Sequence, residues 1–222
     1  MKTDLQVDWC SHKAATYACK NWHYARISPM GKLVKVGAWE GEKFIGAVIF
    51  GRGASPFLGK KYSLAQCECV ELVRIALTSH KTPVSQIVSI ALKFLKKRNP
   101  NIMLVVSFAD PEKGHHGGIY QAGNWIYTGT SAATQELFVK NRWTHLRGAY
   151  HQKTVHTRTR TMPGKHRYLM PLDKETRERV KHMAKPYPKR VTKASSGIQS
   201  ESGGAIPTGT LHLIPDNKEN VA

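Results

Sequence analysis

Residues 102–108 read IMLVVSF, and this stretch decides the fold. A short run that is apolar at successive positions is typical of a strand buried on both faces of a sheet. The run breaks at Asp110 and Pro111, crosses a loop rich in glycine and histidine, and leads to a segment that carries Tyr120. Because ligands bind just beyond the carboxyl ends of strands in open sheets, we expect Asp110 and Tyr120 to mark a reactive site.

Two segments on the N-terminal side of this stretch complete one parallel unit with it. Residues 66–77 alternate between two faces, which is typical of a strand. Residues 83–98 carry apolar side chains at helical spacing, with Thr82 as the expected N-cap. A strand, a helix and a parallel strand form a right-handed unit, so we predict an α/β (α+β) fold with a mixed central sheet. Further elements are expected at residues 9–25, 33–40, 43–51, 125–127, 136–139 and 142–146.

The expected strand at residues 66–77 carries charges in an apolar pattern. Strict alternation places Glu71 on one face and Arg74 on the other, so the two side chains should not pair. A charge within an apolar strand must be paired or must face a polar cavity. Arg74 is therefore a candidate for holding a phosphate or a carboxylate, with a structural ion pair as the alternative.

The charge balance points to a polyanionic partner. The chain has 34 Lys and Arg against 15 Asp and Glu, a net charge of +19. A field of this sign captures nucleic acid, although a merely basic soluble protein has the same balance. Residues 153–193 hold 13 Lys and Arg against 3 Asp and Glu. We therefore predict a catalytic domain at residues 1–152, a basic DNA-contacting extension at 153–193 and a disordered tail at 194–222. The expected DNA contacts are Arg52, Lys153, Arg158, Arg160, Lys165 and Arg167.

Two other classes of protein receive no support from the sequence. No segment approaches the roughly 20 apolar residues of a membrane-spanning helix, and the N-terminus lacks an apolar signal region. The four cysteines do not have the spacing of a zinc ribbon or finger, so we expect free thiols in a reducing cytoplasm.

Six blocks of sequence carry a family resemblance. They resemble, in the same order, the Mom DNA-modification proteins of phages, over residues 7 to about 152. The blocks are VDWC (7–10), WHY (22–24), residues 46–55, ELVRI (71–75), SFADP (107–111) and GGIYQ (117–121). Mom-like proteins are divergent acetyltransferase-fold enzymes. The resemblance implies conversion of adenine in DNA to N6-carbamoylmethyladenine, which shields phage DNA from host restriction, in the cytoplasm of the host cell.

The order of elements is similar to the GNAT-like N-acetyltransferase fold, which implies a mixed central sheet of that type and acetyl-CoA or a related acyl donor as cofactor. That family binds the coenzyme pyrophosphate with a glycine-rich turn after its fourth strand. The corresponding segment here, TSHKTPVS at residues 78–85, contains no glycine. The groups that remain for a donor are the helix end with Lys81, Thr82 and Ser85, together with Arg74.

The chemistry of this modification assigns a role to each candidate. The exocyclic amine of adenine is a poor nucleophile because its lone pair is delocalised into the ring. Inside a duplex the amine is also sterically awkward to reach, so we expect the base to be flipped out. Asp110 would accept a hydrogen bond from N6-H, and Tyr120 would protonate a leaving group or stabilise an oxyanion. His23 and Tyr24 offer an imidazole and a ring that stacks on the base. The alternatives are a turn-opening Asp110, a core Tyr120 and a capping His23.

Other hypotheses stay open at this point. The chain could be an N-acetyltransferase acting on a protein or small amine, or a non-enzymatic DNA-binding protein on the same fold. The expected partners are double-stranded DNA and a small-molecule donor, with a homodimer left open and no membrane. Adjacent His115 and His116 suggest metal ligation, but neighbouring histidines usually point apart, and we assign no metal ligands.

Overall fold

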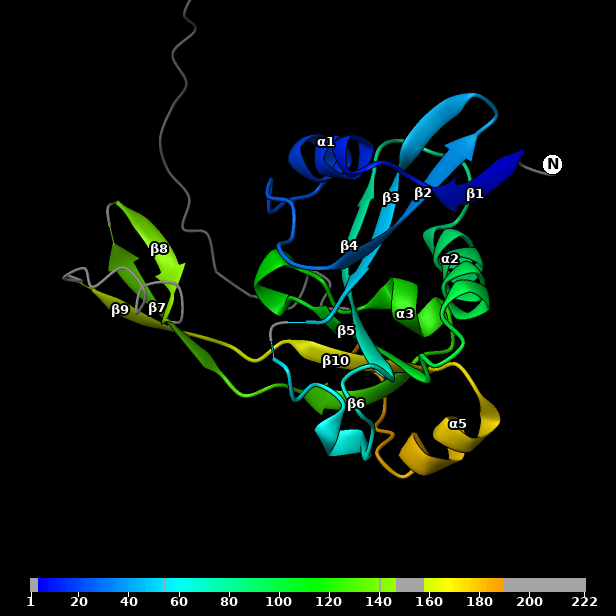
Figure 1. Cartoon of the computed structure of the whole chain (residues 1–222). Coiled ribbons are helices and arrows are strands. Elements are labelled where there is room, and N and C mark those ends of the chain that lie inside the picture. The colour runs from blue at the N-terminus through cyan, green and yellow to red at the C-terminus, as the bar shows by residue number, and fades with distance from the viewer. Residues whose placement is uncertain (1–3, 54, 140, 147–157, 190–222) are drawn as a thin grey trace, which may run out of the picture. The chain divides into compact units, whose positions relative to one another are not determined.

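The computed structural model describes residues 4–53, 55–139, 141–146 and 158–189, which belong to one compact unit. These residues form a seven-stranded sheet in the order β1-β2-β3-β4-β5-β10-β6 and a three-stranded sheet in the order β8-β7-β9 (Figure 1). The strands are β1 Leu5–Trp9, β2 Leu33–Glu40, β3 Lys43–Gly51, β4 Cys69–Leu77, β5 Leu104–Ala109, β6 Ile126–Thr130, β7 Thr134–Val139, β8 Arg142–His145, β9 Thr159–Met162 and β10 His166–Pro171. The helices are α1 His12–Trp22, α2 Val84–Arg98, α3 Gly118–Ala122 and α5 Lys174–Lys181, with short 3-10 turns η1 Lys60–Tyr62 and η2 Pro111–Lys113.

The larger sheet is mixed, as the sequence predicts. Strands β1 to β4 are antiparallel neighbours, and β4 runs parallel to β5. The parallel ladder is short: residues Cys69–Glu71 pair with Leu104–Val106, and beyond these residues the two strands no longer pair with each other. Their carboxyl-terminal halves therefore leave room between them.

A β-bulge overturns one prediction for β4. Ile49 of β3 pairs with Arg74 and the next residue, Phe50, pairs with Leu72, so Val73 is an extra residue in β4. Because a bulge shifts the alternation by one residue, the predicted separation of Glu71 and Arg74 onto opposite faces is wrong. Both residues line the same cavity.

The two long helices cover opposite faces of the sheet. Alternate residues of β3 point to opposite faces: Ala47 and Ile49 pack with α1, and Val48 and Phe50 pack with α2. The α2 residues in this core are Ile87, Val88, Ala91, Leu92 and Leu95, which confirms the predicted helical period. None of the helices in the described residues is long and apolar enough to cross a membrane.

The C-terminal region differs from the predicted basic extension. Strand β10 lies between β5 and β6 in the large sheet, and its Tyr168 and Leu169 are fully buried. Residues 166–171 thus complete the core, because Tyr168 and Leu169 bury their side chains in hydrophobic clusters on opposite faces of the sheet. Residues 147–157 and the predicted tail at 194–222 lie outside the described residues.

Candidate active site

A cavity of about 800 Å³ opens where β4 and β5 separate. We call it the β4–β5 cleft, and it is lined by residues 22–24, 71–75, 108–110 and 114–120 with Ser131 and Lys165. Six residues predicted from the sequence meet there, although they come from separate segments. They are His23, Tyr24, Arg74, Asp110, Tyr120 and Lys165.

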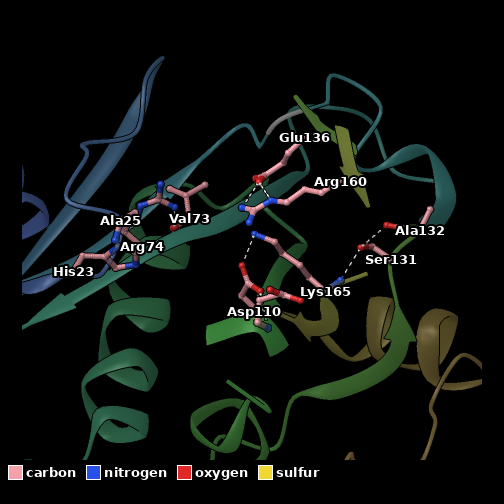
Figure 2. A network of polar contacts seen from close by, with 11 residues as sticks. His23, Ala25, Val73, Arg74, Asp110, Ser131, Ala132, Glu136, Arg160 and Lys165 are labelled. Carbon is pink, nitrogen blue, oxygen red and sulfur yellow. Dashed lines mark hydrogen bonds and ion pairs between the residues drawn. The ribbon is translucent and has the colours of Figure 1, made fainter. Parts of the chain in front are cut away.

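Asp110 follows the last residue of β5 and is held at both carboxylate oxygens. Its Oδ1 accepts a hydrogen bond from the Glu112 amide at 3.1 Å, which caps η2. Its Oδ2 lies 3.0 Å from Nζ of Lys165 (Figure 2). The Asp110 side chain is 13% exposed and that of Lys165 is 48% exposed. Asp110 therefore opens a turn and also presents an oriented carboxylate at the cleft.

Tyr120 of α3 presents a phenol from the core side of the cleft. The single hydroxyl proton of Ser107 has two acceptors within reach, the Tyr120 hydroxyl at 2.7 Å and the Leu72 carbonyl at 3.0 Å, and the shorter bond leaves the Tyr120 proton free to be donated. Burial raises the pKa of Tyr120 to about 12. The phenol is thus a neutral hydrogen-bond donor near neutral pH. Ser107 was missed as a site residue, although it is a polar side chain in an apolar strand.

His23 ends α1 and is buried. Its Nδ1 accepts a hydrogen bond from the Ala25 amide at 3.1 Å, so the ring proton lies on Nε2. Burial, together with the neighbouring Arg74 and His115, lowers the pKa of His23 to about 4. His23 therefore closes the turn after α1 and also lines the cleft, and its ring is neutral above about pH 5.

Tyr24 continues an aromatic row along the cleft. Its ring centroid lies 4.2 Å from that of His23 and 5.5 Å from that of His115, with interplanar angles of 32° and 33°. Tyr24 is 52% exposed. The three rings are tilted relative to one another, and an aromatic ring that is half exposed can stack on a planar base. His115 takes part in this row, and no group of three or more metal-ligating side chains occurs among the described residues.

Arg74 projects from the bulged part of β4. Its Nη1 donates to the Val73 carbonyl at 2.7 Å. Its Nε is buried and has no hydrogen-bond partner among the described residues. A buried unpaired donor is rare in folded proteins and is costly unless a ligand satisfies it.

The other predicted cofactor-binding residues lie elsewhere. The amides of Lys81 and Thr82 and the hydroxyl of Thr82 all donate to the carboxylate of Glu40. Thr82 therefore does not cap α2, whose N-cap is Pro83 without a side-chain bond. Ser85 lines a separate cavity of about 400 Å³ between α2 and β10. The predicted grouping of Lys81, Thr82 and Ser85 with Arg74 is not found.

The predicted DNA contacts are spread over several elements. Arg158 precedes β9, and its guanidinium carbon lies 4.8 Å from the centroid of the Phe138 ring. Arg160 belongs to β9, and its guanidinium carbon lies 4.4 Å from the centroid of the Trp143 ring. Arg160 also pairs with Glu136 at 2.6 Å (Figure 2). Of the remaining contacts, Arg52 is exposed, Nε of Arg167 donates to Thr128, and Lys153 lies outside the described residues.

A mixed sheet whose parallel strands separate around a cleft lined by charged and aromatic side chains forms the frame of the candidate site. The chain belongs to the Mom protein family, whose family model matches residues 4–189. The methylcarbamoylase Mom of Escherichia phage Mu is 26% identical over 205 residues, which cover 84% of each chain.

The chain is also similar to solved acetyltransferase structures. A putative acetyltransferase from Acinetobacter baylyi ADP1 is 13% identical, with 78% of this chain and 94% of that chain covered and a TM-score of 0.46. A Bacillus subtilis acetyltransferase in complex with CoA is 13% identical, with coverage of 77% and 99% and a TM-score of 0.44. Spermidine N-acetyltransferase from Vibrio cholerae is 11% identical, with coverage of 76% and 94% and a TM-score of 0.47.

Proposed function

We propose that this protein transfers a carbamoylmethyl group to N6 of adenine in double-stranded DNA, and that the product protects phage DNA from host restriction. The observation that carries the proposal is the β4–β5 cleft, which gathers His23, Tyr24, Arg74, Asp110 and Tyr120. The name of the phage Mu relative, methylcarbamoylase, supports the group transferred. The net charge of +19 supports DNA as the partner.

The cleft has the properties that a flipped adenine requires. Its volume of about 800 Å³ admits a base together with a small donor. The exposed face of Tyr24 offers a stacking surface, and the neutral ring of His23 lies beside it. Extruding the base costs a few kcal/mol, and stacking on an aromatic ring offsets about 1–3 kcal/mol of that cost.

Asp110 and Tyr120 would divide the proton transfers. As N6 forms its bond to the donor carbon, it must lose a proton, and the oriented Asp110 carboxylate is placed to accept the hydrogen bond from that N–H. The leaving group departs with the bonding electron pair. Because the pKa of Tyr120 is raised to about 12, its hydroxyl serves as a hydrogen-bond donor to the developing negative charge and not as a base.

Mass spectrometry of nucleosides from cells that express the chain tests this proposal. The expected result is a new adenine nucleoside with the added mass of a carbamoylmethyl group, which is lost in Asp110→Asn. Asp173→Asn is the matched control, because Asp173 caps α5 through the Thr176 amide in the way that Asp110 caps η2. Unmodified adenine under good expression refutes the proposal, as does equal loss in both variants.

A further inference from the structure

The turn between β4 and α2 is closed by the chain's own carboxylate. Glu40, the last residue of β2, accepts hydrogen bonds from the Lys81 amide at 2.9 Å and the Thr82 amide at 2.7 Å. The Thr82 hydroxyl donates to the same oxygen at 2.7 Å. These hydrogen bonds hold the pKa of Glu40 below its usual range. A carboxylate therefore already takes the amide donors of the turn after the fourth strand, where the acetyltransferase resemblance implies a coenzyme pyrophosphate.

The closure belongs to the fold and is not an incidental side-chain contact. Glu40 pairs with Leu5 of β1 and with Lys43 of β3, so its backbone is fixed between two strands. Its carboxylate contacts Lys81 and Thr82, which follow Glu40 in the sequence by 41 and 42 positions. A pyrophosphate at this turn would meet a negative charge and would find the amide donors already used. The next residue, Pro83, has no N–H to offer. The residues of this turn thus do not fit coenzyme A.

Arg74 offers a second place for an anionic donor, inside the cleft. Its buried Nε lacks a partner among the described residues, and a guanidinium is the side chain best suited to an oxyanion. The other charged groups that line the cleft are Glu71, Asp110 and Lys165, of which the last two form an ion pair. His23, which also lines the cleft, is neutral near neutral pH, so the guanidinium and ammonium groups that line the cleft are those of Arg74 and Lys165.

We infer that this protein holds its donor through an oxyanion, carboxylate or phosphate, on Arg74, and that Glu40 excludes coenzyme A from the β4–α2 turn. Only the role of the bound molecule as the donor of the transferred group rests on the proposed function. The anion site and the closed turn are properties of the chain that binding experiments read without any modified adenine.

Titration calorimetry with coenzyme A tests the closure. The wild-type chain is expected to give no measurable binding, whereas Glu40→Gln and Glu40→Ala, which remove the charge, are expected to bind coenzyme A at least about tenfold more tightly than the detection limit that bounds the wild type. The conservative Gln variant keeps an acceptor oxygen for the turn and so preserves the fold. Tight binding of coenzyme A to the wild type overturns the inference. Equal weakness in all three proteins also overturns it, because Glu40 would then not be the cause.

Arginine-selective NMR tests the anion site, with acetate and inorganic phosphate as probes. The Nε–H signal of Arg74, assigned by its loss in Arg74→Lys, is expected to shift on addition of one of the two anions, which identifies a carboxylate or a phosphate donor. Arg167 is the internal control, because its Nε already donates to Thr128 at 2.9 Å. An Arg74 signal that neither anion moves, or one that moves no more than that of Arg167, refutes the site.

Discussion

Acidification should destabilise this protein through His23. The folded pKa of about 4 lies below the usual 6.5, so the unfolded chain binds the proton more readily. The stabilisation is fully present above about pH 6.5 and is lost as the pH falls towards 4. At about pH 5, the difference between the two pKa values corresponds to about 2 kcal/mol of lost unfolding free energy, a large share of the stability of a typical domain.

Urea unfolding of three proteins at about pH 7.5 and about pH 5 measures this loss. His23→Asn keeps an acceptor for the Ala25 amide but does not titrate, so its stability should fall by about 2 kcal/mol less than that of the wild type. His182→Asn is the matched control, because the exposed His182 ends α5 as His23 ends α1. An equal fall in unfolding free energy between the two pH values for the wild type and His23→Asn would refute a buried, neutral His23.

Further predictions concern the cleft and the DNA surface. Ser107→Ala removes the partner of Tyr120 and a bond to Leu72, and should lower the unfolding free energy by about 1–2 kcal/mol and reduce adenine modification; normal modification would contradict the role of this bond. Lys165→Met should change the unfolding free energy by less than about 1 kcal/mol, because the Lys165 side chain is half exposed. The same variant should reduce modification, because the Asp110 carboxylate would lose the ion pair that orients it. Arg158→Gln should lower the slope of log affinity for duplex DNA against log salt by about one, whereas Arg160→Gln should have a smaller effect because Arg160 already pairs with Glu136; equal slopes would refute the assignment.

Local patterns made much of the sheet predictable. The apolar run at 102–108 and the helical period at 83–98 correspond closely to β5 and α2, because burial alone dictates both patterns. Asp110 and Tyr120 are only ten residues apart and flank one loop, so their meeting at one cleft follows from the strand that precedes them. These parts of the site depend on contacts that are short in sequence.

Long-range contacts account for what the sequence could not predict. No glycine or proline in β4 indicates the bulge at Val73 from the sequence. The bulge places Glu71 and Arg74 at the same cavity. The contact of Glu40 with Thr82 spans 42 residues. Strand β10 lies within the basic segment 153–193. The sequence analysis interpreted that segment from its charge and so missed the six residues of the strand. In each case the deciding partner lies on another element.

The central claim is that the phenol of Tyr120 acts within the β4–β5 cleft on adenine. Nucleoside mass spectrometry from cells that express Tyr120→Phe and Tyr127→Phe tests it most directly, because each change removes one hydroxyl from a buried ring, and Tyr127 bonds to His166 away from the cleft. We predict that carbamoylmethylated adenine disappears in Tyr120→Phe and persists in Tyr127→Phe. Persistence of the modified nucleoside in Tyr120→Phe at the wild-type level would contradict the account.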